Sequence, residues 1–291
     1  MDSALDLPPL NVPQLLRQHG LQPKKSLGQN FLFDSNILQR IVAAAEIPSH
    51  ATVLEVGAGL GTLTRYLARA AKQVVAVELD ERLIPLLREV LSNAANVALL
   101  QGDILSLDLT PYLGNADPLL VVANIPYYIT SALIRRLLEG PVRPLRLVLT
   151  VQREVAERIC AAPGEMSLLA LSVQVYGHPQ PIGRIPAGAF YPPPKVDSAI
   201  LRVDLYPQPR IPTEDLGLFF RLAQAGFAQR RKTLRNALTA GLGWHSTRVE
   251  TLLEQAGIDP QRRAETLGLD EWARLVQIYR QTQVQREDDL T

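Results

Sequence analysis

The sequence has a single cysteine, Cys160, and only four histidines, which lie far apart among 291 residues. One cysteine excludes internal disulfides, and neither residue type shows the spacing of a zinc site. No metal site is therefore expected. No apolar run approaches the length that crosses a membrane, and the acidic start, Met1–Asp6, lacks the character of a signal or transit peptide. These absences predict a cytoplasmic protein without membrane association.

The sequence also lacks a strong excess of charge. Its formal net charge is +1, with 47% apolar and 20% charged residues, which is ordinary for a globular protein. Any affinity for nucleic acid must therefore come from a local basic cluster. The length suffices for one large domain and a smaller one, and nothing in the sequence demands more than a monomer.

Strand-like and helix-like segments alternate through the first part of the chain. Segments rich in Val and Leu predict strands over 52–56, 73–78, 97–101, 119–123 and 145–151. Helices are predicted over 37–45, 62–71, 82–91, 131–138 and 153–160, with Asp34 or Ser35 as N-cap of the first. This alternation predicts an α/β fold with a Rossmann-like, doubly wound, mostly parallel sheet.

The last third of the chain predicts a different architecture. Segment 167–175 fits a helix or a strand, with a helix favoured, and strands are expected over 182–185 and 198–206. After these, helices are predicted over 213–227, 230–238, 248–256 and 269–280. We therefore expect a loosely attached N-terminal extension (1–23) with one short helix (12–19), an α/β domain (24–206), a proline-rich linker (207–212) and a small all-helical C-terminal domain (213–291).

Three alternating glycines, Gly57, Gly59 and Gly61, follow the first predicted strand and open a helix. Glycines allow a sharp turn and the close approach of a ligand. Their spacing differs from the G-x-G-x-x-G of dinucleotide-binding proteins, which disfavours a nicotinamide-dependent oxidoreductase. Glu55, just before the turn, favours a cationic ligand over a phosphate. A glycine turn without a ligand is the alternative.

Polar residues stand at the ends of the next three predicted strands. Glu78 ends the second strand, where an acid can bind the ribose hydroxyls of an adenosine. Asp80 fits the N-cap of the next helix. Asp103 follows the third strand and can accept from an adenine amine, although a solvated turn also explains it. Asn124 ends the fourth strand, and because the carboxyl ends of parallel strands meet at one edge, these groups are expected to converge.

The stretch Asn124-Ile-Pro-Tyr127 has the chemistry to hold a flat, amino-bearing base. The carbonyl oxygen of Asn124 can accept from an exocyclic amine, and Tyr127 offers a stacking face. Pro126 fixes the backbone, so that a neighbouring carbonyl is presented at a set angle. An ordinary proline turn after a strand is the alternative.

The densest basic cluster of the chain is predicted to lie on a helix after Phe227. Arg231 and Arg235 are one helical turn apart and would face the same side. We interpret the cluster as a surface that contacts RNA phosphates, with a solvated helix face as the alternative. The cationic residues assigned to this function are Lys24, Lys25, Arg230, Arg231, Lys232 and Arg235.

Together these stretches resemble the S-adenosylmethionine-dependent adenine-N6 methyltransferases of ribosomal RNA, over about residues 24–279. The motifs that carry the resemblance are Gln29–Leu32, Glu55–Gly61, Glu78–Asp80, Gly102-Asp103 and Asn124–Tyr127. Two further stretches, Phe190–Ser198 and Gly226–Ala237, are similar to the members that dimethylate small-subunit rRNA. Ala58 departs from the family, which usually has proline there.

The resemblance implies a class I methyltransferase domain, S-adenosylmethionine as cofactor and the rRNA of the immature 30S subunit as partner. It implies transfer of methyl groups to N6 of adenines, two adjacent ones in the 3′-terminal hairpin, to give N6,N6-dimethyladenosine. The implied cofactor contacts are Asn30, Leu32, Gly57, Gly59, Glu78, Asp103 and Asn124. The residues implied at the target adenine are Asn124, Tyr127 and Phe190. Phe190 would clamp the base against Tyr127, with simple core packing as its alternative.

Two other functions share part of this pattern. An adenine-N6 methyltransferase of large-subunit rRNA would carry similar motifs, but the stretch from Phe190 to Pro194 and the basic cluster disfavour it. A non-catalytic nucleic-acid-binding factor could keep the same fold. The intact glycine turn and the intact Asn124–Tyr127 stretch disfavour that second alternative.

Overall fold

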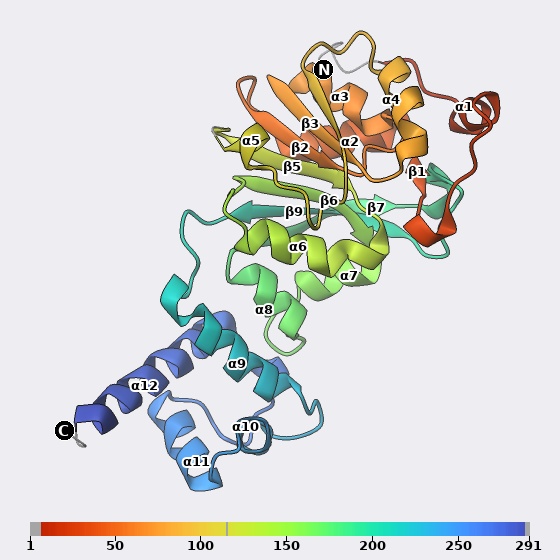
Figure 1. Cartoon of the computed structure of the whole chain (residues 1–291). Helices are drawn as coiled ribbons and strands as arrows, with labels where there is room; N and C mark the ends of the chain where they lie inside the picture. The colour runs from red at the N-terminus through yellow and green to blue at the C-terminus, as the bar shows by residue number, and fades with distance from the viewer. Residues whose placement is uncertain (1–6, 115, 289–291) are drawn as a thin grey trace. The chain divides into compact units, whose positions relative to one another are not determined.

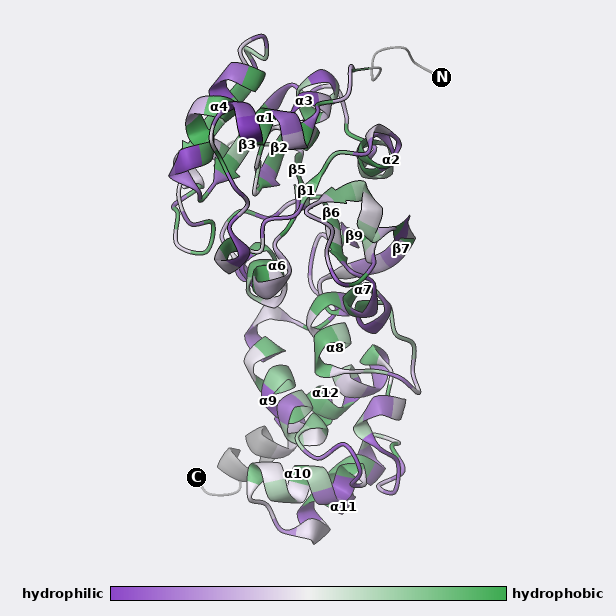
Figure 2. Cartoon of the chain, turned by 90° about the vertical axis from the view of Figure 1, so that its right-hand side faces the viewer, coloured by the Kyte–Doolittle hydropathy of each residue, from purple (hydrophilic) through white to green (hydrophobic). Residues whose placement is uncertain are grey.

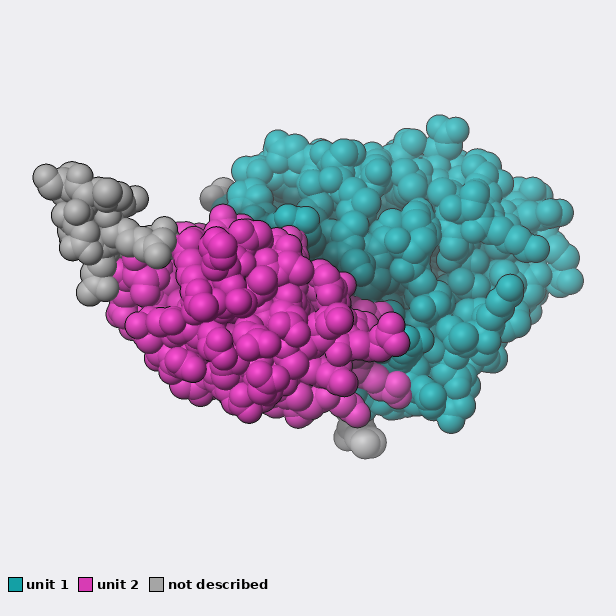
Figure 3. Space-filling model, turned by 90° about the horizontal axis from the view of Figure 1, so that it is seen from below, with its two compact units in different colours: residues 1–156, 179–205 teal, residues 157–178, 206–291 magenta. Residues whose placement is uncertain are grey.

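A computed structural model describes residues 7–114 and 116–288 and shows a mixed α/β architecture (Figure 1). The chain divides into two compact units (Figure 3), unit 1 with Met1–Ala156 and Pro179–Leu205, and unit 2 with Glu157–His178 and Tyr206–Thr291. Residues 157–178, which the sequence pattern places in the α/β domain, thus belong to unit 2. The acidic start, Met1–Asp6, lies outside the described residues.

The centre of unit 1 is a seven-stranded sheet with the strand order β4-β3-β2-β5-β6-β9-β7. The strands are β2 (Thr52–Val56), β3 (Gln73–Glu78), β4 (Val97–Gln101), β5 (Leu119–Asn124), β6 (Arg146–Gln152), β7 (Gly177–Ile185) and β9 (Ser198–Leu205). Strands β2 to β6 pair in parallel, and β9 runs antiparallel to β6. Strands β3 and β4 follow β2 on one side, and β5 and β6 lie on its other side. Open parallel sheets bind ligands at the point where the strand order reverses in this way.

Helices surround this sheet in unit 1 (Figure 1). They are α1 (Val12–Gln18), α2 (Ser35–Ala45), α3 (Thr62–Ala70), α4 (Ile84–Val90), α5 (Thr110–Leu113), α6 (Thr130–Glu139) and α7 (Arg153–Ile159), whose end passes into unit 2. Asp34 is the N-cap of helix α2, and its carboxylate accepts from the Ile37 N–H at 3.1 Å. Its Ile41 and the Val53 of β2 share one core. Both hydrophobic and hydrophilic residues occur along these helices (Figure 2). The mostly parallel sheet with its helices confirms the predicted α/β fold class.

The N-terminal segment packs more closely than its composition predicts. The expected short helix is present as α1, and its Val12 and Leu16 are 0% and 2% exposed. They pack with Phe31 and with Leu60 of the glycine turn. A second sheet pairs β1 (Phe31–Leu32) with β8 (Phe190–Tyr191). The prediction of a loose attachment is therefore wrong for the described part of the extension, because α1 buries apolar side chains on unit 1.

Unit 2 is helical and has its own core. Its helices are α8 (Leu168–Gln174), α9 (Leu216–Phe227), α10 (Leu234–Leu242), α11 (Ser246–Gln255) and α12 (Leu269–Asp288). Trp272 and Phe219 are fully buried in this core. Ser167 caps α8 by accepting from the Ala170 N–H at 3.1 Å, so the helix favoured for this segment is confirmed. In the described ranges, no helix is long and apolar enough to cross a membrane.

One predicted helix begins later than expected. Helix α10 starts at Leu234 after Thr233, whose hydroxyl accepts from the Asn236 N–H. The preceding residues form a turn, closed by the bond from the Lys232 N–H to the Gln229 carbonyl at 2.9 Å. The helix predicted from Arg230 is therefore wrong in its first turn, because Thr233 provides the N-cap. Arg231 and Arg235 do not share a helix face.

Candidate functional site

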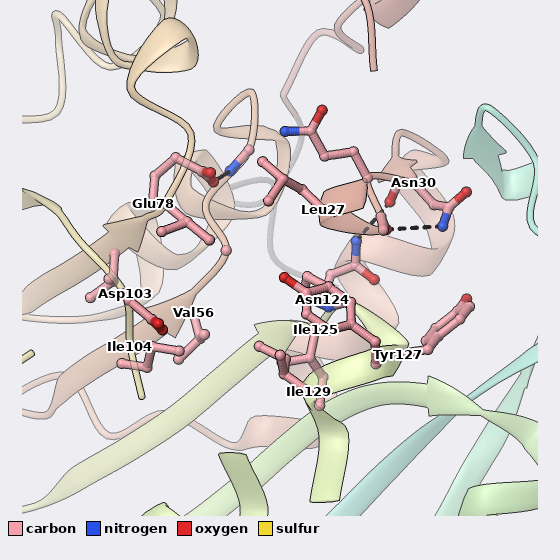
Figure 4. A pocket seen from close by; sticks show the side chains of 18 of the residues that line it. Leu27, Asn30, Val56, Glu78, Asp103, Ile104, Asn124, Ile125, Tyr127 and Ile129 are labelled. Carbon is pink, nitrogen blue, oxygen red and sulfur yellow. Dashed lines mark hydrogen bonds between the residues drawn. The ribbon is translucent and has the colours of Figure 1, made fainter. Parts of the chain in front are cut away.

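A cavity of about 940 Å³, including its open mouth, lies at the carboxyl ends of β2, β3, β4 and β5 (Figure 4). Each of these strand ends contributes at least one residue that the sequence predicts in the site. These residues are Gly57, Gly59, Glu78, Asp103 and Asn124. The parallel strands therefore bring these groups to one edge of the sheet, as their pattern predicts.

The glycine turn lies against the strands β3 and β1. Gly59 has a φ of 59°, and a Cβ there would come within 3.1 Å of the Phe31 ring. Both facts favour glycine at this position. The N–H of Ala58 donates to the Val77 carbonyl at 3.1 Å. Proline, which the family usually has there, carries no N–H and could not make this bond.

Glu78 is held rigidly at the end of β3. It is 6% exposed, and its Oε2 accepts from the Gly59 N–H at 2.8 Å. Its Oε1 accepts from the Asp80 N–H at 2.8 Å. Burial raises the pKa of Glu78, and the backbone N–H groups oppose that rise. Each carboxylate oxygen has two lone pairs, so each can accept a further hydrogen bond from a ligand in the cavity.

Asp103 lies after β4 and lines the same cavity. Its Oδ1 accepts from the Leu105 N–H at 2.9 Å, so the solvated turn suggested by the sequence is present. Among the described residues, no donor reaches its Oδ2. One carboxylate oxygen therefore shapes the turn, and the other stays available to a ligand.

The side chain of Asn124 is oriented by the segment before β1. Its Nδ2 donates to the Asn30 carbonyl at 3.1 Å, and the Asn30 Nδ2 donates in turn to the Gly28 carbonyl at 3.1 Å (Figure 4). Only this amide orientation gives the Asn30 carbonyl a donor from Asn124. No donor to the Asn124 Oδ1 is found in residues 7–114 and 116–288. The free group of this amide is therefore an acceptor.

Tyr127 forms a wall of the cavity beside Asn124. Its hydroxyl lies 2.5 Å from the Oγ of Ser198, a fully buried residue on β9. Burial raises the pKa of Tyr127, and the hydrogen bond to Ser198 opposes part of that rise. The phenol is thus anchored at its polar end, and the ring is positioned in the lining.

Phe190 and Leu32 lie outside the cavity lining. They face each other across the β1–β8 pair, and they are 2% and 1% exposed in the core of unit 1. The arrangement matches the core packing that the sequence left as the alternative for Phe190. The predicted contacts of Phe190 with the base and of Leu32 with the cofactor remain predictions.

The segment from Lys24 to Phe31, here called the strap, connects both sides of the cavity. Its Gln29 donates through Nε2 to the Asp80 Oδ2 at 2.9 Å and accepts at Oε1 from the Lys24 N–H at 2.7 Å. Arg82 holds the pKa of Asp80 well below its usual range through two hydrogen bonds of 2.9 and 2.6 Å. Gln29 has no role predicted from the sequence, because no spacing pairs it with a residue 51 positions away.

The predicted RNA-binding residues lie in both units. Lys24 and Lys25 are exposed on the strap, with the Lys24 Nζ 3.5 Å from the Asp80 Oδ1. Arg230, Arg231 and Lys232 are exposed in the turn before α10. Arg235 lies 3.5 Å from Glu250 of α11. Three cations thus remain directed to solvent in one turn of unit 2.

Glu55 is buried in β2 and lies outside the cavity lining, although the sequence favours it for a cationic ligand. It is 1% exposed, and its Oε2 has no hydrogen-bond partner in the described part of the chain. Burial raises the pKa of Glu55 to about 8. The Thr64 side chain opposes this rise, and the charge of the Glu78 carboxylate adds to it. The free protein therefore holds Glu55 protonated at neutral pH.

No group of three or more potential metal-ligating side chains is found among the described residues.

We expect Glu55→Gln to raise the free energy of unfolding at pH 8 and to change it little at pH 5. The unfolded carboxyl loses its proton near pH 4.5, and the folded one near pH 8. The unfolded state is therefore favoured as pH rises through this interval, by up to about 5 kcal/mol. Glutamine does not titrate. Urea unfolding of both proteins at several pH values measures the difference, and curves that stay parallel from pH 5 to 8 would contradict it.

Comparison with known proteins shows the family of this chain. The profile of the family described as ribosomal RNA adenine dimethylase matches residues 20–281. The ribosomal RNA small subunit methyltransferase A of Dehalococcoides mccartyi strain CBDB1 is 47% identical over 267 residues, which cover 91% of each chain. That of Macrococcus caseolyticus is 42% identical and covers 92% of this chain and 93% of its own.

Two solved structures are similar over most of the chain. The dimethyladenosine transferase from Plasmodium falciparum has a TM-score of 0.74 and 26% identity, covering 86% of this chain and 98% of its own. The 23S rRNA methyltransferase ErmE has a TM-score of 0.70 and 30% identity, covering 86% and 99%. This chain therefore belongs to the ribosomal RNA adenine dimethylase family, and the membership that its motifs indicate is confirmed.

Proposed function

We propose that this protein transfers methyl groups from S-adenosylmethionine to N6 of adenines in small-subunit rRNA and forms N6,N6-dimethyladenosine. The observation that carries this proposal is the orientation of Asn124, whose free amide oxygen lies in the same cavity as Glu78 and the glycine turn. One cavity thus combines acceptors for a nucleoside cofactor with an acceptor for an amine. The 42–47% identity to small-subunit enzymes, against 30% to a 23S enzyme, favours the small subunit.

The acceptors and the bare backbone of the cavity support S-adenosylmethionine as the cofactor. The free lone pairs of Glu78 suit two ribose hydroxyls, and the free oxygen of Asp103 suits an adenine amine. The bare backbone at Gly57 and Gly59 allows the methionine part to approach closely. When bound, this cofactor supplies an electrophilic methyl group on a positively charged sulfur.

Asn124 and Ile125 would prepare the target amine. The lone pair of an adenine N6 is delocalised into its ring, which makes the amine a weak nucleophile. Hydrogen bonds from N6 to the Asn124 Oδ1 and the Ile125 carbonyl favour a tetrahedral nitrogen and stabilise the positive charge that develops on it. Positioning accounts for most of the rate, and the proton leaves to water after transfer.

The base must leave its stack to enter the cavity, and aromatic side chains offset the cost of unstacking. Tyr127, anchored through Ser198, supplies one such face.

We assign the reaction to the cytoplasm, with a monomer acting on the immature 30S subunit. The family match supports an rRNA partner.

Methylation of isolated ribosomal subunits tests this function. The purified protein is incubated with labelled S-adenosylmethionine and with small or large subunits that lack its modification. We expect label in the small subunit alone, as dimethyladenosine. Label in the large subunit would support the 23S alternative, and RNA binding without cofactor binding would support the non-catalytic factor.

We expect the joint replacement of Arg230, Arg231 and Lys232 by alanine to reduce the salt dependence of RNA binding. Each phosphate contact with a single strand contributes roughly 0.7 to the slope of log K against log salt, so loss of three lowers it by about 2. Binding of a small-subunit rRNA fragment between about 50 and 200 mM salt measures the slope. Arg263→Ala is the control, since this exposed arginine of unit 2 lies 3.9 Å from Glu265. An unchanged slope in the triple variant would remove this turn from the RNA surface.

A further inference from the structure

Tyr128 is an aromatic side chain that the proposed function leaves without a role. It follows Tyr127 in a 3₁₀ turn (Tyr127–Ile129), lines the cavity mouth and is 60% exposed. In the described part of the chain, no other large apolar side chain is as exposed. Its sequence neighbours Tyr127 and Ile129 are seen in Figure 4. A ring at the rim of the cavity is placed to contact a ligand that enters it.

The two adjacent tyrosines point in different directions. A 3₁₀ turn has three residues per turn, so consecutive side chains diverge by about 120°. Tyr127 is fixed inward by its hydrogen bond to Ser198. Tyr128 therefore projects away from that wall, toward solvent at the opening. The pair can thus contact two different nucleotides.

The strap supports the Tyr128 ring along one edge. Gly28 has a φ of 60°, and a Cβ there would lie 3.2 Å from the Tyr128 Cδ1 and 3.4 Å from the Pro126 Cβ. The backbone of Gly28 thus packs directly beside the ring and limits its motion. The N–H of Gly28 donates to the Lys25 carbonyl at 3.0 Å, which keeps the exposed Lys25 within one turn of this contact.

We propose that Tyr128 is a stacking platform for the nucleobase next to the target adenine, and that Lys25 contacts the phosphate of that nucleotide. The inference rests on the proposed function and extends it to a second nucleotide. When one base is extruded, its neighbour loses a stacking partner, and an aromatic face replaces it for any base type. An exposed ring held by the strap, with a cation nearby, matches this requirement for single-stranded RNA.

Kinetics of Tyr128 variants test the platform. With small subunits as substrate, we expect Tyr128→Ala and Tyr128→Leu to raise the KM for RNA about tenfold, with kcat unchanged. The Kd for S-adenosylhomocysteine stays as in the wild type. Tyr128→Phe keeps the aromatic face and is expected to behave as the wild type. Tyr112→Ala is the matched control, since this tyrosine of α5 is 45% exposed and lies outside the cavity lining.

Fluorescence gives a second readout that a merely structural role would not change. An rRNA fragment with 2-aminopurine beside the target adenine should be quenched on binding to the wild type and to Tyr128→Phe, but not to Tyr128→Leu. Equal quenching by all three, or a cofactor Kd that rises together with the RNA KM, would overturn the proposal. If the wild type transfers no methyl group at all, the proposed function fails, while quenching still reports whether Tyr128 stacks.

Discussion

Asn124→Ala is expected to lower single-turnover methyl transfer by at least about 100-fold, the scale seen when one preorganised polar group is removed from a reacting centre. The variant loses the amide oxygen that we assign to the target amine. Cofactor affinity should stay within about threefold, because Glu78 and the glycine turn keep their mutual bonds. Transfer from labelled S-adenosylmethionine and calorimetry with S-adenosylhomocysteine measure the two effects. Equal losses in both would contradict the role.

Two variants separate chemistry from stability in this experiment. Asn124→Asp keeps an acceptor but cannot donate to the Asn30 carbonyl, so we expect an activity between those of the wild type and the alanine variant. Asn96→Ala removes hydrogen bonds to the carbonyls of Ala68 and Ala71, outside the cavity lining. It should lower stability and leave turnover of the folded protein unchanged.

Glu78→Ala is expected to raise the Kd for S-adenosylhomocysteine at least about 100-fold. The variant loses two acceptors for ribose hydroxyls, and each hydrogen bond to a charged group contributes about 1.5–3 kcal/mol. It also leaves the Gly59 N–H without its partner, which loosens the glycine turn. Calorimetric titration of the folded variant measures this loss. Because we assign these two bonds to the cofactor and not to RNA, the affinity for an rRNA fragment should not change.

Glu81→Ala is the matched control for this variant. Glu81 is an exposed acid three positions along the chain, in the 3₁₀ turn before α4, and it lies outside the cavity lining. Its removal changes the net charge by the same amount without touching the site. A Kd that rises equally in both variants would show a general effect of charge, and an unchanged Kd in Glu78→Ala would place the ribose elsewhere.

The sequence predicts the sheet and the convergence of its strand ends well, for a physical reason. Strands of a parallel sheet are buried on both faces, so they are short apolar runs that stand out from their flanks. Strands β2, β3 and β4 have the predicted bounds. Once strands are parallel, their carboxyl ends share one edge, and the polar residue after each strand must lie there.

The contacts that close the cavity could not be predicted in this way. The two-residue strands β1 and β8 are too short to show a periodicity, and they pair Phe31 with Tyr191. Phe190 has a side chain that suits a core as well as a base, and only the pairing with Leu32 shows where it lies. For the extension, Val12 and Leu16 are one helical turn apart, which is a signal of burial that its polar composition concealed.

The basic turn before α10 illustrates a competition between two local signals. A run of long cationic side chains is compatible with a helix, and the prediction extended the helix through it. Thr233 offers a hydroxyl to the backbone N–H of Asn236, and N-caps of this kind define where a helix begins. The cap determines the start of α10, and the cations lie outside it.

The bond between Asn124 and the Asn30 carbonyl also bears on selectivity among bases. It turns the amide NH2 toward the strap, so a base that enters meets an oxygen. Guanine and uracil carry a keto oxygen where adenine and cytosine carry an amino group, and two facing oxygens repel each other. If Asn124 receives the target base as we propose, a main-chain carbonyl 94 residues away sets which bases the site accepts, and we expect keto bases to be disfavoured.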